Sequence, residues 1–154
     1  LTADAYHITA SDPEGTGSRN AMQQALNEAG ISLEQVDYIN THGTSTPIGD
    51  GAEVKAIQDL FGKHAYNISL TSSKSMMGHL LGGSGAVEAI ISLLSMQHSM
   101  VTPTINHEEG DEDPKIDYKL NFTFNQAQSR DIRYAMSNNF GFGGQNACLL
   151  FKKL

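Results

Sequence analysis

The sequence lacks the marks of several common protein classes. One cysteine, Cys148, among 154 residues excludes an internal disulfide framework and a cysteine-rich zinc site, and it fits a reducing, cytoplasmic setting. Ten basic residues against 17 acidic ones give a net charge of −7, so we expect no nucleic-acid partner. Long hydrophobic runs are also missing. The longest, "AVEAIISLLSM", is broken by Glu88 and by serines, which predicts a core helix and no membrane span.

The beginning of the chain shows no targeting segment. "LTADAYHITASDPEG" has neither a basic start nor a hydrophobic targeting core, and it lacks an initiator methionine. We therefore expect the chain to be a fragment of a longer protein. Its 154 residues suffice for one compact domain, 1–154, with a substantial core.

Apolar spacing predicts that strands and helices alternate along the chain. Gly30 and Gly62 are expected to end the first two helices. Alternation of this kind, ahead of two closing strands, indicates an α/β fold with a sheet covered on at least one face. The predicted elements are helices over 18–30, 50–62 and 86–96, and strands over 36–40, 66–74, 133–140 and 146–154.

Three turns that follow predicted strands carry the side chains that could take part in catalysis or ligand binding. His42 follows the first strand, Lys74 and His79 follow the second, and Phe140 lies in a glycine loop between the last two. Ligands in α/β sheets bind just beyond the carboxyl ends of strands. We therefore expect these residues at one rim of the sheet.

Three familiar kinds of site do not fit these turns. The neighbours of both histidines are Thr, Ser, Gly and Met, without His-Glu-x-x-His spacing, so no metal is expected. "GGSGA" lacks the Gly-x-Ser-x-Gly pattern of a hydrolase, and neither glycine segment has dinucleotide-binding spacing. What remains is a pair of imidazoles that can donate hydrogen bonds to an oxygen becoming negative. Such a pair suits an enolate formed beside a thioester or ketone.

Four segments together resemble one known family. The chain is similar to the C-terminal half of β-ketoacyl-[acyl-carrier-protein] synthases of the fatty-acid elongating type, in the thiolase superfamily. The resemblance implies one half of a layered αβαβα fold, with a mostly parallel five-stranded sheet and covering helices. The matching segments, in the family's order and spacing, are "DAYHIT" (4–9), "THGTSTPIGD" (41–50), "SSKSMMGHLLGGSGAVE" (72–88) and "SNNFGFGGQNACLLFKK" (137–153).

The resemblance also implies a reaction and the residues that carry it. In this family a cysteine accepts the growing acyl chain, and malonyl-carrier protein then loses CO2 to give the attacking carbanion. His42 and His79 match the histidines that donate hydrogen bonds to the malonyl thioester oxygen. Lys74 and its acidic partner Glu88 match the pair that keeps the histidines oriented and sets the electrostatic field of the site. Phe140 matches the gating phenylalanine.

Further residues are implied to bind or support the substrate arm. The phosphopantetheine arm arrives on the acyl carrier protein, so no cofactor belongs to the chain itself. Plainer interpretations stay open: the threonine hydroxyls could cap the next helix, and His7 could merely support its loop. The residues implied for arm binding are Thr44, Thr46, Thr9 and Phe142, and the supporting ones are Asp4, His7, Gly141 and Gly143.

The family's nucleophilic cysteine belongs to its N-terminal half, which this chain does not contain. Cys148 lies among aliphatic residues of a strand and is expected to be an inert buried thiol. The expected partners are therefore that N-terminal half and an acyl carrier protein, with a homodimer in the full-length enzyme. A polyketide ketosynthase and a non-catalytic subunit like a chain-length factor remain as alternatives. An isolated half would also expose an apolar surface.

Overall fold

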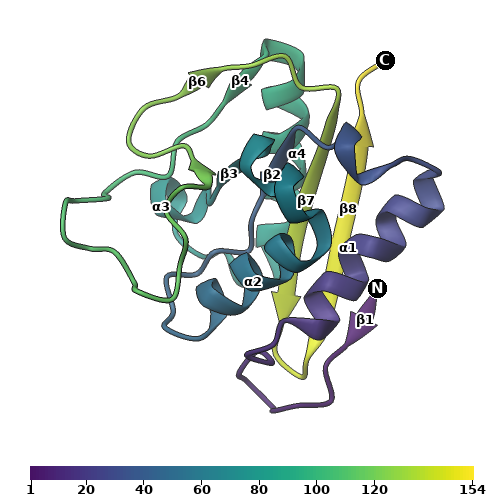
Figure 1. Cartoon of the computed structure of the whole chain (residues 1–154), viewed down its shortest axis with the longest axis vertical. Helices are drawn as coiled ribbons and strands as arrows, with labels where there is room; N and C mark the ends of the chain where they lie inside the picture. Colours follow the sequence, from purple (N-terminus) through teal and green to yellow (C-terminus); the bar gives the residue numbers. More distant parts are fainter.

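The computed structural model describes all 154 residues (Figure 1). Three short 3-10 turns, Leu33–Gln35, Gly62–Asn67 and Leu81–Gly83, supplement the regular elements. The helices are α1 (Thr16–Ala29), α2 (Gly49–Phe61), α3 (Lys74–Met77) and α4 (Ser84–His98). The strands are β1 (Thr2–Ala3), β2 (Tyr38–Asn40), β3 (Ser69–Thr71), β4 (Met100–Val101), β5 (Asn121–Phe122), β6 (Gln128–Ser129), β7 (Tyr134–Gly141) and β8 (Gln145–Lys152).

The main sheet has six strands in the order β1-β8-β7-β2-β3-β5. β2 pairs in parallel with both β3 and β7, and β5 pairs in parallel with β3. β8 returns antiparallel along β7, and β1 lies antiparallel on β8. The α/β class and the mostly parallel central pairing are confirmed. The expected number of five strands is wrong: the sheet has six, and its two edge strands, β1 and β5, are segments of only two residues.

Local chemistry sets where several elements begin and end. Gly30 ends α1 with a left-handed φ of 64°, and its N–H bonds back to Leu26 and Asn27, as a glycine C-cap does. The strand predicted over 66–74 is shorter than expected. A 3-10 turn occupies its beginning up to Asn67, and Lys74 already starts α3.

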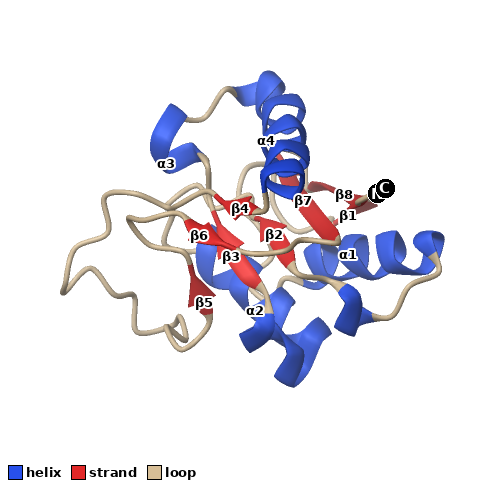
Figure 2. Ribbon diagram, turned by 90° about the horizontal axis from the view of Figure 1, so that it is seen from above, coloured by secondary structure: helices blue, strands red, loops and turns tan.

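Helices cover both faces of the sheet, as Figure 2 shows from above. α1 and α2 pack on one face, where Met22, Ile57 and Phe61 join Ile39 and Met136 of the strands in the larger core. α4 lies on the other face, where its Met96 packs with Tyr38 and Ala135 in a smaller core. Successive side chains of β2 and β7 thus pack into opposite cores, because successive side chains of a strand point to opposite faces of the sheet.

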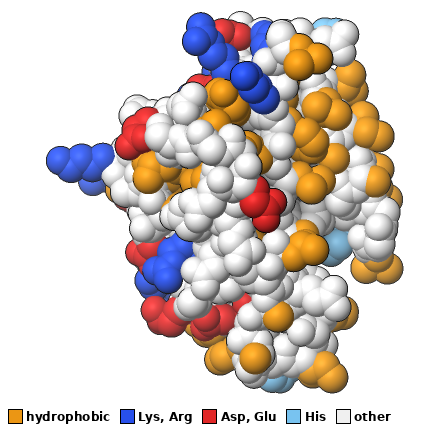
Figure 3. All heavy atoms as spheres, turned by 90° about the vertical axis from the view of Figure 1, so that its right-hand side faces the viewer, with side chains coloured by type: hydrophobic (Ala, Val, Ile, Leu, Met, Phe, Trp, Pro, Cys, Tyr) orange, Lys and Arg blue, Asp and Glu red, His pale blue; other side chains and the backbone are white.

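α4 turns its polar side toward the sheet and its apolar side outward. Ser84, Glu88, Ser92 and Ser95 are buried, whereas large aliphatic side chains remain exposed: Ile90, Leu93 and Leu94 are 55%, 47% and 46% exposed. Apolar side chains gather on the right of Figure 3, the side on which α4 lies. The core helix predicted for this segment is therefore buried on one side only. No helix of the fold combines the length and the apolar character that crossing a membrane would require.

Candidate active site

The carboxyl ends of β2, β3 and β7 meet at one rim because these strands are parallel. The turn after β2 carries His42, the segment after β3 carries Lys74 and His79, and Phe140 lies near the end of β7. The expected grouping at one rim is therefore present.

A buried carboxylate accepts hydrogen bonds from the backbone of the turn that carries His42. Glu53 of α2 is 3% exposed, and its two carboxylate oxygens accept the backbone N–H groups of His42 (3.0 Å) and Gly43 (2.9 Å). The Asn138 amide donates to the same carboxylate at 3.0 Å. Burial nevertheless raises the pKa of Glu53 to about 7, against the opposing effect of these three donors. Glu53 thus fixes the backbone on which His42 stands.

The His42 ring is kept neutral by its surroundings. Burial lowers the pKa of His42 to about 3, together with the positive charge of Lys74 and the proximity of His79. The ring centroids of His42 and His79 lie 5.6 Å apart, edge to face at 83°. The Phe140 ring lies 5.6 Å from His42 on another side. Two imidazoles at this separation can reach one small ligand atom between them.

His79 has its proton position set by a backbone group. The N–H of Leu81 donates to Nδ1 of His79 at 3.1 Å, so Nδ1 carries a lone pair and the neutral ring holds its proton on Nε2. The Ser84 hydroxyl lies 3.0 Å from the same Nδ1. The Nε2–H group is therefore the one left to donate to a ligand.

Lys74 and Glu88 form a buried ion pair beside these rings. Lys74 Nζ donates to Glu88 Oε1 at 2.5 Å, and the two side chains are 5% and 0% exposed. The second oxygen, Oε2, accepts the Asn139 amide at 2.9 Å. The expected partner of Glu88 is confirmed as Lys74. Glu88 also ties α4 to the end of β7, next to Phe140.

A cavity of about 960 Å³ collects most of the predicted site residues. Lys74 and Glu88 lie outside its lining, and so do His7 and Gly143. Thr44 and Thr46 share a hydroxyl–hydroxyl hydrogen bond of 3.2 Å, and α2 has no side-chain cap, so they do not cap that helix. The predicted residues that line the cavity are Asp4, Thr9, His42, Thr44, Thr46, His79, Phe140, Gly141 and Phe142.

The "DAYHIT" segment and the glycine loop hold each other at the mouth of this cavity. Gly143 N–H donates to Ile8 O, and Asp4 N–H donates to Gly144 O, both at 2.8 Å. Asp4 also accepts the Asn146 amide at 2.6 Å. His7 Nδ1 accepts N–H groups of its own loop and does not line the cavity, which favours the supporting interpretation of His7.

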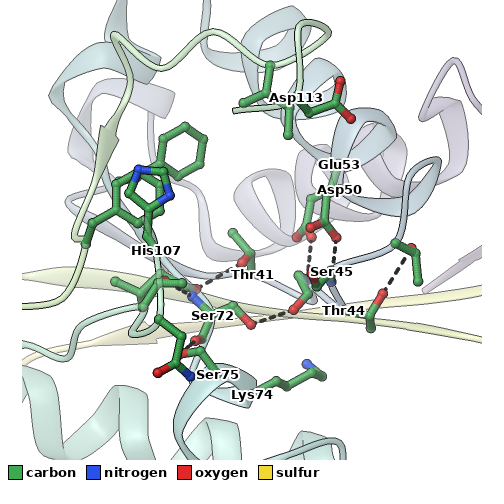
Figure 4. A pocket seen from close by; sticks show the side chains of 18 of the residues that line it. Thr41, Thr44, Ser45, Asp50, Glu53, Ser72, Lys74, Ser75, His107 and Asp113 are labelled. Carbon is green, nitrogen blue, oxygen red and sulfur yellow. Dashed lines mark hydrogen bonds between the residues drawn. The ribbon is translucent and has the colours of Figure 1, made fainter. Parts of the chain in front are cut away.

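A second cavity of about 730 Å³ shares Thr44, Thr46 and His79 with the first, and Lys74 lines only this second one. Figure 4 shows Ser72, Ser75 and Lys74 at one side of it, and Asp50 and Glu53 of α2 at the other. The His107 ring stacks on Phe124, with ring centroids 3.9 Å apart, and contributes to the wall. Asp50 accepts the Ser45 N–H and so shapes the turn between β2 and α2.

Sequence reasoning missed Glu53, Ser84 and the two asparagines that hold the site. Glu53 lies on the same face of α2 as Ala56 and Ile57, so a charge on an apolar face was the available signal. No comparable signal marked Ser84. Cys148 is partly buried in β8, and burial raises its pKa to about 12, which suits an inert thiol. No group of three or more His, Cys, Asp or Glu side chains is arranged to hold a metal.

The fold is that of a condensing-enzyme domain. Residues 1–108 match the family described as "Beta-ketoacyl synthase, C-terminal domain", and the chain belongs to that family. It is 55% identical over 152 residues to 3-oxoacyl-[acyl-carrier-protein] synthase 2 of Staphylococcus aureus, covering 99% of this chain and 36% of that protein. The chain therefore spans about a third of the length of that relative.

Solved structures agree on the fold. A type II polyketide ketosynthase in complex with its acyl-carrier protein, AntDE:AntF, superposes with a TM-score of 0.93 at 33% identity. The ishigamide ketosynthase/chain length factor gives 0.90 at 35% identity. Each comparison covers 99% of this chain and 36% of the other. The predicted thiolase-like ketosynthase fold is confirmed.

Proposed function

We propose that residues 1–154 form the C-terminal domain of a decarboxylating condensing enzyme that elongates fatty acyl chains. The observation that carries the proposal is the pair of imidazoles, with ring centroids 5.6 Å apart, at the carboxyl rim of the sheet. One ring is neutral through burial and the other has its proton directed to Nε2. Two uncharged donors beside one cavity suit an oxygen that gains negative charge during the reaction.

The reaction uses these donors when malonyl-carrier protein enters. His42 and His79 donate to the malonyl thioester oxygen while the bond to the carboxylate carbon breaks, releasing CO2 and leaving the electron pair in an enolate. The enolate carbon then attacks the acyl thioester on the enzyme's cysteine, which leaves as thiolate. Lys74 supports the step indirectly, because its charge beside His42 keeps that ring neutral and Glu88 holds the ammonium in place.

The phosphopantetheine arm that carries the substrate passes the threonine hydroxyl groups that line the larger cavity. Thr44 and Thr46 point their hydroxyls at each other in the cavity lining, and both can turn to amide groups of a phosphopantetheine arm. Thr9 and Phe142 line the mouth, where Phe142 is 77% exposed and free to close over the arm. No cofactor of the chain's own is required, since the arm arrives on its carrier.

Phe140 is the proposed gate between acylation and extension. Its ring packs 5.6 Å from His42, and it lies near the end of β7, just before the loop 142–144 that joins β7 to β8. Movement of this loop would clear the space beside His42, and Gly143, at a φ of 86°, supplies the backbone freedom for it.

The missing cysteine implies that further residues of the same synthase complete the site. The exposed aliphatic side chains of α4 supply a surface for this N-terminal half, since a helix with a buried polar side and an exposed apolar side needs a second cover. A homodimer, an acyl carrier protein partner and a cytoplasmic location, as predicted from the sequence, belong to the same proposal. The exposed acidic run 108–112 is unsuited to an acidic carrier protein.

A polyketide ketosynthase is the second candidate, because one of the similar structures is named as a type II polyketide synthase complex of a ketosynthase with its acyl-carrier protein. The donor pair serves either product equally. A chain-length-factor-like subunit fits less well, because both histidines are present and paired.

The test uses the complete synthase with His79→Ala, and with His98→Ala as a matched control on the exposed end of α4. His79→Ala should lower malonyl decarboxylation about 100- to 1,000-fold, as loss of an oxyanion donor does, while acyl transfer to the cysteine stays measurable. In the same assay Phe140→Ala should disturb the order of acylation and extension. Decarboxylation at the normal rate in His79→Ala would refute the donor assignment.

A further inference from the structure

Ser84 is the first residue of α4 and is fully buried at 0% exposure. Its hydroxyl oxygen makes two hydrogen-bond contacts, one with a side chain and one with a backbone N–H. It lies 3.0 Å from His79 Nδ1, and it accepts the N–H of Leu80 at 3.0 Å. The residue thus sits directly behind one of the two proposed donors, on the side away from the ligand position.

The placement of hydrogens follows from these contacts. The Leu80 N–H can only donate, so it occupies a lone pair of the Ser84 oxygen. The hydroxyl hydrogen is left to turn toward the neighbouring acceptor, which is Nδ1 of His79. Leu81 N–H donates to the same Nδ1 at 3.1 Å. Nδ1 therefore accepts from two donors, and both favour the tautomer with its proton on Nε2.

We propose that Ser84 is a positioning residue for the condensing reaction. Its hydroxyl holds the His79 ring in the Nε2–H tautomer and in the orientation that presents this N–H to the cavity shared with His42. The assignment rests on the proposed function for its effect on catalysis. The tautomer itself is a property of the free protein.

A comparison with Ser92, another buried serine of α4, disfavours a purely structural role for Ser84. The N-cap of α4 is Gly83, and no side chain caps the helix. Ser92, also fully buried, donates to the backbone carbonyl of Glu88 at 2.8 Å, the usual bond of a serine inside a helix. Ser84 instead turns its hydroxyl to a histidine of the candidate site. Ser92 is therefore the matched control.

The experiment compares Ser84→Ala, Ser84→Cys and Ser92→Ala in the complete synthase labelled with 15N-histidine. Without substrate, NMR should show the His79 signal of an Nε2–H tautomer in the unaltered protein. Removing one neutral hydrogen-bond donor should raise the Nδ1–H population about two- to twelvefold relative to Nε2–H. Cysteine, a weaker donor of similar shape, should give a smaller rise. Ser92→Ala should leave the ratio unchanged.

The same variants separate positioning from folding in kinetics. Ser84→Ala should lower kcat for malonyl decarboxylation about two- to twelvefold with KM unchanged, and Ser92→Ala should not. An unchanged tautomer ratio in both Ser84 variants, or equal losses of kcat in Ser84→Ala and Ser92→Ala, would overturn the proposal. A changed tautomer ratio together with normal decarboxylation in His79→Ala would overturn the proposed function instead.

Discussion

Removing the carboxylate of Glu88 should cost the protein far more stability than removing an exposed carboxylate. The Lys74–Glu88 pair is 2.5 Å long with side chains 5% and 0% exposed, so Glu88→Ala leaves a buried ammonium without a counter-charge. Breaking such a pair costs about 3–5 kcal/mol of unfolding free energy. Asp59→Ala breaks the Lys55–Asp59 pair, which is 2.7 Å long but 43% and 41% exposed, and should cost at most about 0.5 kcal/mol.

A double variant separates the charge from the packing. Lys74→Met combined with Glu88→Leu removes both charges and keeps apolar volume, so it should recover most of the loss. It should not recover all of it, because the Asn139 amide also loses its acceptor, at about 1–3 kcal/mol. Urea unfolding measures the change in unfolding free energy in Glu88→Ala, Asp59→Ala and the double variant, provided that the dependence of this free energy on urea concentration is the same in all of them. Equal losses in Glu88→Ala and Asp59→Ala would refute the reasoning from burial.

Two further predictions concern other parts of the fold. Glu53 has a pKa of about 7 in the folded protein against an ordinary 4.5, so the folded state holds its proton more tightly and the unfolding free energy should fall by roughly 3 kcal/mol as pH rises from about 4.5 to 7, then level off. Urea unfolding at several pH values should show a weaker dependence of the unfolding free energy on pH in Glu53→Gln than in the unaltered protein. The same pH dependence in both proteins would contradict the pKa of Glu53. Leu93→Lys, on the exposed face of α4, should weaken association with the N-terminal half, whereas Lys63→Ala on an exposed turn should not; co-purification of separately expressed halves measures both, and equal association in Leu93→Lys would exclude that face.

Much of the fold was predictable because it depends on local spacing. The three longer helices and the closing hairpin follow from apolar periodicity, and Gly30 ends α1 because glycine accepts a left-handed φ. The edges of the sheet were not predictable. β1 and β5 have two residues each and become strands only because a neighbouring strand offers its free backbone groups.

The candidate site divides in the same way. His42, His79 and Lys74 could be singled out because their turns follow strands and resemble those of a known family. Glu53 and Ser84 could not, because their roles depend on atoms distant in the chain or on the way a turn folds back. Glu53 meets Asn138 across 85 residues, and Ser84 reaches His79 only because Leu80 and Leu81 turn the backbone toward it.

The sequence by itself determined the class of the fold, the order of its elements and the positions of the two candidate imidazoles just after strands, since these depend on residue type and short-range spacing. The tertiary structure alone decided the electrostatic state of those imidazoles. His42 is neutral because burial and the Lys74 charge make protonation costly, and His79 carries its proton on Nε2 because two donors meet at its other nitrogen. Desolvation and hydrogen-bond direction depend on which groups pack together in space, and residue spacing alone does not specify that.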